Sequence, residues 1–151
     1  MTVAAAALTI IAAALSGCNG RTAYAGYRDI ARSGWEEDST LVWDVSVTDT
    51  LAAYDVILSV RHTPAYPYQN IWFFVKNDLT GEADTLEFYL ADQRGRWLGN
   101  GFGDHKEMPC LLAKGVRFPH TAPYRFAVRH GMREQSLRGI TEVGLFIEKE
   151  K

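Results

Sequence analysis

The sequence has few cysteines and no strong charge of either sign. Its 151 residues include two cysteines, Cys18 and Cys110, so the chain can form at most one internal disulfide. There are 16 Lys and Arg residues against 18 Asp and Glu residues, which leaves a formal net charge of −2. No Lys/Arg run or acidic tail interrupts this balance. We therefore expect no nucleic-acid partner.

The sequence also lacks the motifs of several catalytic and metal-binding classes. No G-x-S-x-G motif is present, and no nucleophile signature surrounds Cys110, which we interpret as a small buried hydrophobic residue. The charged residues Asp104, His105 and Glu107 favour a solvated loop over a catalytic cluster. No two histidines have the spacing of paired metal ligands; the four are His62, His105, His120 and His130. We expect no enzyme activity, no metal and no cofactor.

Long apolar runs are absent except at the start of the chain. From Val3 to Leu15 every residue except Thr9 is apolar. A helix of that length spans roughly 20 Å, against a hydrocarbon core of about 30 Å, so the run predicts a signal peptide instead of a transmembrane span. Residues 15–18, Leu-Ser-Gly-Cys, match the bacterial lipobox, in which small residues precede a cysteine that takes up lipid.

These features divide the chain into three predicted parts. Residues 1–17 are a lipoprotein signal peptide, residues 18–38 are the lipidated Cys18 with a tether, and residues 39–151 are a folded domain. One departure from the lipoprotein pattern is that no Lys or Arg precedes the apolar run. The alternative is a chance cysteine after an ordinary signal peptide. Acylation of Cys18 would hold the domain at a membrane surface.

The rest of the chain alternates between apolar and polar residues. Alternation with a period of two is typical of half-buried strands. Residues 70–77 are apolar on both faces and predict a central strand. The pattern occurs in six segments, at residues 41–47, 54–63, 70–77, 84–92, 124–129 and 143–148. We predict an all-β fold, a single antiparallel β-sandwich of jelly-roll-like form.

Three glycines stand two residues apart in the segment GNGFGDH, at Gly99, Gly101 and Gly103. A phosphate-binding loop would open a helix, but no helical pattern follows, and the dinucleotide-binding spacing is incomplete. The glycines instead favour a tight bend between strands. We expect Trp97 and Leu98 to be buried against the sheets at this bend.

Aromatic residues gather near the turns. Such rings can contact a partner protein or stack on sugar rings, and the alternative is that they cap the core. The candidate contact residues are Tyr66, Tyr68, Trp97 and Phe102.

The order of several motifs resembles a known family. After the lipobox cysteine come Tyr54-Asp55-Val56 and Val60-Arg61-His62, then YPYQNIW at 66–72, DTLEF at 84–88, GRWLGNG at 95–101 and LRGI at 137–140. In this order they resemble the gliding motility lipoprotein GldH family of the Bacteroidota, over residues 54–148. No catalytic residues are carried over from the resemblance.

The resemblance implies a non-enzymatic, lipid-anchored protein of the cell envelope. Its partners would be the membrane and other envelope proteins of the gliding motility and type IX secretion machinery. Many members occur in organisms that do not glide, so a role in secretion or envelope assembly is equally open. The implied location is the outer membrane, with the periplasmic or surface face undetermined. A surface carbohydrate-binding module that uses the same aromatic residues is the alternative function.

Overall fold

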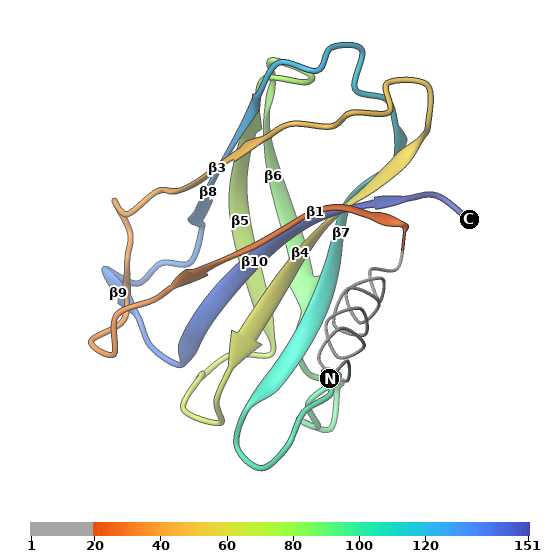
Figure 1. Ribbon diagram of the computed structural model, residues 1–151. Coiled ribbons are helices and arrows are strands. Elements are labelled where there is room, and N and C mark those ends of the chain that lie inside the picture. The colour runs from red at the N-terminus through yellow and green to blue at the C-terminus, as the bar shows by residue number, and fades with distance from the viewer. Residues whose placement is uncertain (1–19) are drawn as a thin grey trace, which may run out of the picture.

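Ten β-strands follow one another along residues 20–151, which are the residues that the computed structural model describes (Figure 1). The described residues contain no helix, and so none long and apolar enough to cross a membrane. The predicted signal peptide and Cys18 lie outside them. The strands are β1 (Thr22–Asp29), β2 (Trp35–Glu36), β3 (Leu41–Val45), β4 (Tyr54–His62), β5 (Asn70–Asn77), β6 (Ala83–Tyr89), β7 (Lys106–Val116), β8 (Tyr124–His130), β9 (Ser136–Leu137) and β10 (Ile140–Lys149).

Two four-stranded antiparallel sheets pack face to face. The first sheet has the order β1-β10-β4-β7, and the second has the order β3-β8-β5-β6. The paired strands nest around one another along the chain: β5 pairs with β6, β4 with β7, β3 with β8 and β1 with β10. This nesting is the jelly-roll arrangement and confirms the predicted fold class.

The core consists of the inward-facing residues of both sheets, as the alternation predicts. In β4, Val56, Leu58 and Val60 are buried, and they belong to the same core cluster as Phe73 of β5 and its buried neighbours in the second sheet. Burying each side chain of this size contributes about 1.5–3 kcal/mol to folding. Cys110 is also buried, as expected, and burial raises the pKa of its thiol to about 12.

The predicted central strand β5 does lie inside its sheet, between β8 and β6. Its residues Ile71, Phe73 and Val75 are buried. No layer formed by residues 20–151 covers the opposite face of the strand, where Trp72 and Phe74 are 37% and 42% exposed. The apolar pattern on both faces therefore correctly predicts that β5 lies inside its sheet. Only one of the two faces packs into the core.

The domain begins earlier than residue 39, so the predicted tether at 18–38 is wrong for most of its length. Residues 22–29 form β1, an edge strand of the first sheet that pairs with β10. Two side chains connect β1 to the second sheet: Arg28 Nε donates to the Val42 carbonyl oxygen at 3.1 Å, and Trp43 Nε1 donates to the Gly26 carbonyl oxygen at 2.9 Å. Hydrogen bonds between strand backbones form whatever the side chains are. Strand β1 can therefore pair with β10 although its side chains show no clear apolar alternation.

The two ends of the sandwich differ. One end, which we call the termini end after the start of β1 and the end of β10, has the first residue of β1 paired with Glu148. The β3–β4, β5–β6 and β7–β8 connections gather at the same end (Figure 1). The opposite end, which we call the glycine-corner end, carries the connections at 63–69, 90–105 and 131–139. Strand β4 runs the full height between the two ends, over about 26 Å.

Candidate functional site

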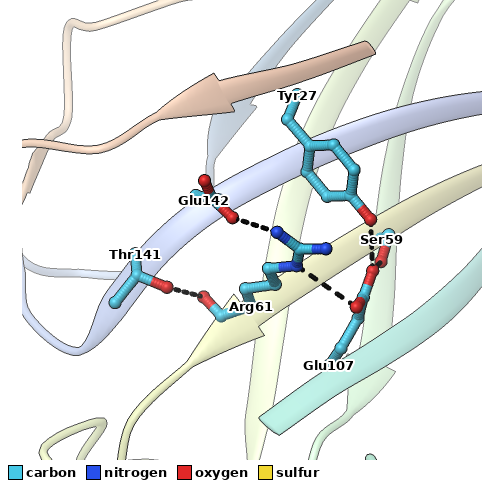
Figure 2. A network of polar contacts seen from close by, with 6 residues as sticks. All are labelled: Tyr27, Ser59, Arg61, Glu107, Thr141 and Glu142. Carbon is cyan, nitrogen blue, oxygen red and sulfur yellow. Dashed lines mark hydrogen bonds and ion pairs between the residues drawn. The ribbon is translucent and has the colours of Figure 1, made fainter. Parts of the chain in front are cut away.

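A network of polar side chains joins all four strands of the first sheet on its outer face (Figure 2). Its centre is Glu107, at the start of β7. The Glu107 carboxylate accepts hydrogen bonds from the Tyr27 hydroxyl on β1, from Ser59 Oγ on β4 at 2.5 Å and from Arg61 Nε at 3.2 Å. Arg61 also reaches β10, where its Nη1 lies 2.5 Å from Glu142 Oε2.

The network keeps the Glu107 carboxyl in its charged form. Partial burial of the group raises its pKa, but the hydrogen bonds from Ser59, Tyr27 and Arg61 lower it by more, so the pKa lies below its usual range. Three donors on one carboxylate are typical of a charged group held in a fixed position. Glu107 is therefore an ionised anchor that fixes the start of β7 against β4 and β1.

Arg61 is the cationic member of the network. Its guanidinium group lies 4.0 Å from the centroid of the Tyr27 ring, in cation–π geometry. The hydrogen bond to Glu142 is the largest of the effects that raise the pKa of Arg61, so the side chain stays charged. Arg61 thus forms ion pairs with both nearby carboxylates, those of Glu107 and Glu142.

The glycine corner lies directly before Glu107 and turns the chain from β6 into β7, as the sequence predicts. Two backbone hydrogen bonds between Asn100 and Glu107, of 2.8 and 3.1 Å, close the turn. A Cβ at Gly99 would come within 2.6 Å of the Glu107 carbonyl oxygen, and a Cβ at Gly101 would overlap the His105 carbonyl oxygen. The glycines are therefore required by the close approach of two backbone segments.

A cavity of about 990 Å³ opens beside this corner at the glycine-corner end. One wall is the polar network, with Arg61, Glu107 and Glu142. The other walls come from the β1–β2 connection, the glycine corner and the β9–β10 connection. Apolar groups in the lining include Ile30, Ile140 and the ring of Phe102, which is 98% exposed. The cavity has the size and the mixed lining of a binding site.

The charges around the cavity do not cancel. The basic residues in the lining are Arg32, Arg61, Lys106 and Arg138, and the acidic residues are Asp29, Glu107 and Glu142. Glu107 and Glu142 both pair with Arg61. Among the described residues no ion pair involves the other three cations, and Asp29 is the single remaining acid. The four cations and three carboxylates of the lining leave a formal excess of one positive charge, and three of the cations take part in no ion pair of the described residues.

The structure places the four predicted contact residues in different surroundings. Phe102 lines the cavity. Tyr66 is 2% exposed, and its hydroxyl donates to the Asn70 carbonyl oxygen at 2.6 Å. Tyr68 is half-buried, donates to Glu134 and lines a second, smaller cavity of about 510 Å³. Trp97 is half-buried.

Tyr66 and Trp97 pack against His62, and Tyr68 packs against Tyr66. The ring of His62 lies 4.5 Å from that of Trp97 and 6.1 Å from that of Tyr66, and the two tyrosine rings lie 5.9 Å apart. The three aromatic residues thus close the core at this end, which is the alternative role considered above. Leu98 is 47% exposed, so its expected burial is wrong: it points outward while Trp97 packs inward.

Most of the network was not identifiable from the sequence. Tyr27 is 80 residues from Glu107 along the chain, and Ser59 and Arg61 are 48 and 46 residues away. The interpretation of residues 104–107 as a solvated loop holds for Asp104 and His105, which are exposed, and is wrong for Glu107. The sequence does show a charged residue, Glu107, where the chain leaves a glycine bend and enters a strand. Alternation within that strand does not show which residue of a neighbouring strand will lie opposite Glu107.

Nothing in the described part of the chain groups three or more metal-binding side chains in a position to hold an ion. The fold and the cavity together define a small jelly-roll sandwich with a large cavity at one end.

Comparison with known proteins identifies the family. The family model described as GldH lipoprotein matches residues 22–147, and the chain belongs to the GldH lipoprotein family. The match begins at β1, in agreement with the early start of the domain.

Two relatives cover nearly the whole chain. The chain is 31% identical over 144 residues to the gliding motility lipoprotein GldH homolog of Christiangramia forsetii, which covers 89% of this chain and 88% of that protein. It is 29% identical over 152 residues to the gliding motility lipoprotein GldH of Flavobacterium johnsoniae, with 94% of each chain covered. No solved structure matches the chain.

Proposed function

We propose that this chain is a non-enzymatic, lipid-anchored protein of the cell envelope that docks a partner in the gliding motility and type IX secretion machinery. The family membership and the lipobox at residues 15–18 support the lipoprotein part of this proposal. The names of both relatives support the link to motility. The anchoring membrane is the outer membrane.

The observation that carries the docking role is the position of the cavity relative to the anchor. Only residues 19–21 separate Cys18 from the first residue of β1, so the linker extends over at most about 14 Å. It reaches the domain at the termini end. The cavity lies at the other end of β4, roughly 26 Å away. A short linker at one end holds the cavity away from the lipid, where a protein partner can reach it.

The anchor is tested by substitution of Cys18. In the native organism, the wild-type protein is expected in the membrane fraction, and mass spectrometry is expected to find acyl chains on its terminal cysteine. The Cys18→Ala variant is expected in the soluble fraction. An unmodified terminus on wild-type protein found free in solution would refute the anchor.

The role in motility and secretion is tested by deletion of the gene. We expect reduced colony spreading in a gliding host and a reduced secretome in any host that uses this machinery. Expression of the wild-type chain should restore both, and the Cys18→Ala variant should not. Normal secretion together with normal spreading after deletion would exclude the proposed role.

Carbohydrate binding is a second candidate function. The aromatic side chains that favour it are not the four contact residues predicted from the sequence. Trp72, Phe74 and Tyr89 are exposed on the outer face of the second sheet. On neighbouring strands, Asn70 Nδ2 donates to Glu87 Oε1 at 2.6 Å beside them, so polar groups accompany the rings. A glycan array distinguishes the candidates: binding that is lost in Trp72→Ala, in a variant that still folds, would favour carbohydrate.

A further inference from the structure

We propose that the cavity at the glycine-corner end binds an extended polypeptide segment of the partner that carries acidic side chains next to apolar ones. This inference rests on the proposed docking function and adds the chemistry of the docked segment. It follows from the charges in the lining, from the apolar groups between them and from the exposed ring at the rim.

The charge on the walls selects an acidic ligand. Arg32, Lys106 and Arg138 come from three separate segments, and none pairs with an acid among the described residues. The Lys106 ammonium has a weak hydrogen bond to the Gly101 carbonyl oxygen at 3.4 Å, which leaves its charge uncompensated. Complementary charges on a ligand would speed its association and fix its orientation.

The carboxylates of the lining oppose this charge only in part. Glu107 and Glu142 are held by Arg61, and Glu107 is further held by Tyr27 and Ser59. Arg61 offsets one of these two negative charges, so the lining as a whole keeps one net positive charge, and an incoming carboxylate meets three cations without an ion pair and one further acid, Asp29. The polar network thus forms one wall of the cavity, and the three cations without an ion pair supply the attraction.

The apolar lining argues for a polypeptide over a small anion. The half-buried Ile30 and the exposed Ala65 lie among the charged residues of the walls. A lone inorganic anion would leave these groups in contact with water. The cavity is also at the upper end of the range of about 300–1,000 Å³ that small-ligand sites span. An extended chain satisfies both conditions, because successive side chains point in opposite directions and can contact apolar and basic groups in turn.

Phe102 is the expected anchor of the docked segment. Its ring is almost fully exposed at the rim, between Gly101 and Gly103. Exposed aromatic side chains become the dominant contacts of many interfaces when a partner covers them, because each ring buries about 150–250 Å². The hydrogen-bonded turn between Asn100 and Glu107 holds the corner that carries this ring.

The test measures peptide binding to the full-length chain in detergent micelles. The probe is a fluorescein-labelled peptide of alternating Asp and Leu, about twelve residues long, which extends over roughly 40 Å. The comparison peptide replaces every Asp with Lys. We expect fluorescence anisotropy to show binding of the Asp–Leu peptide at least about tenfold tighter than that of the Lys–Leu peptide, with the difference shrinking as salt screens the charges.

Charge-reversing variants locate the site. The double variant Lys106→Glu/Arg138→Glu should weaken binding of the Asp–Leu peptide by about tenfold or more, and Phe102→Ala should weaken it severalfold. The control is Lys76→Glu/Lys114→Glu, which makes the same change in net charge at exposed residues outside the cavity lining. Circular dichroism checks that each variant is folded.

Three results would overturn the inference: no preference for the acidic peptide, an equal loss in the control variant, or tighter binding of dextran sulfate that the cavity variant abolishes. The proposed function is judged separately by expressing Lys106→Glu/Arg138→Glu in the deletion strain. If that variant fails to restore spreading and secretion although the acidic peptide shows no preference, the docking function stands and the ligand chemistry is wrong.

Discussion

Glu107 and Arg61 face each other on neighbouring strands, with Arg61 Nε 3.2 Å from Glu107 Oε2. The pair joins the start of β7, which follows the glycine corner, to β4, which runs the full height of the sandwich. Because Glu107 also holds Tyr27 of β1, an edge strand on each side of the sheet depends on one carboxylate. The pair therefore couples the shape of the cavity wall to the stability of the sheet.

Replacing Glu107 should cost stability. In Glu107→Gln the charge is lost, and the three donors face a weaker acceptor. Because the site is partly exposed, we expect a decrease of about 1 kcal/mol in the free energy of unfolding. Urea denaturation monitored by tryptophan fluorescence measures it.

Glu142→Gln is the matched control for this change. Glu142 contacts Arg61 alone within the network, whereas Glu107 has three donors. The loss in Glu142→Gln should therefore be smaller. Equal losses in both variants would mean that Glu107 is not the centre of the network.

The glycine corner gives a second prediction about stability. Gly101→Val should lower the free energy of unfolding by about 1–3 kcal/mol, because its φ of 158° is rare for other residues and a Cβ there would overlap the His105 carbonyl oxygen. Thermal melting monitored by circular dichroism measures it. Gly81→Val is the control: Gly81 has a φ of 72°, but no atom lies within 4 Å of an added Cβ. If both variants lose the same amount, backbone overlap at the corner is not the reason for the glycine.

The sequence predicted the six strands whose side chains alternate and missed the two long strands that do not. Strand β1 contains Ala23, Ala25 and Gly26, whose small side chains give no apolar period. Strand β7 contains Pro109 and Gly115 and shifts its register against β4. Both are edge strands, which tolerate such residues because one side of the backbone is unpaired.

The candidate site was less predictable than the fold. Local spacing identifies a bend at Gly99 and Gly101, because the requirement for glycine arises within a few residues. The identity of the partners of Glu107 depends on strand register across the sheet, which a single sequence does not specify. The aromatic candidates Tyr66, Tyr68 and Trp97 pack over the end of the core, whereas Phe102 lines the cavity. A ring near a turn can face solvent or cover the core, and the packing at the end of the sandwich decides between the two.

Two buried histidines predict how stability depends on pH. Burial lowers the pKa of both His62 and His130. The Nε2 atom of His130 donates to the Trp35 carbonyl oxygen at 2.9 Å, and its Nδ1 atom has no partner among the described residues. Since the pKa values are lower in the folded state, the unfolded state binds more protons below its own pKa of about 6.5.

Stability should therefore be constant above pH 7 and fall as the pH drops below about 6.5. A series of thermal melts between about pH 8 and pH 5 measures this fall. A second decline is expected below about pH 4.5, where Glu107 becomes protonated in the unfolded state. A melting temperature that stays level from neutral pH until the carboxylates titrate would show that the histidines are not buried in their neutral form.

The buried thiol of Cys110 should resist chemical modification in the native protein. Its pKa of about 12 leaves almost no thiolate at neutral pH, and the side chain is shielded by the core. We expect 5,5′-dithiobis(2-nitrobenzoic acid) to leave Cys110 unmodified in buffer and to modify it fully in concentrated urea. Cys110→Ser, which shows the background from any other thiol, is the control. Rapid labelling of the folded wild-type chain would mean that β7 detaches from the sheet in solution, and the cavity wall that Glu107 builds at the start of β7 would then not be a rigid surface.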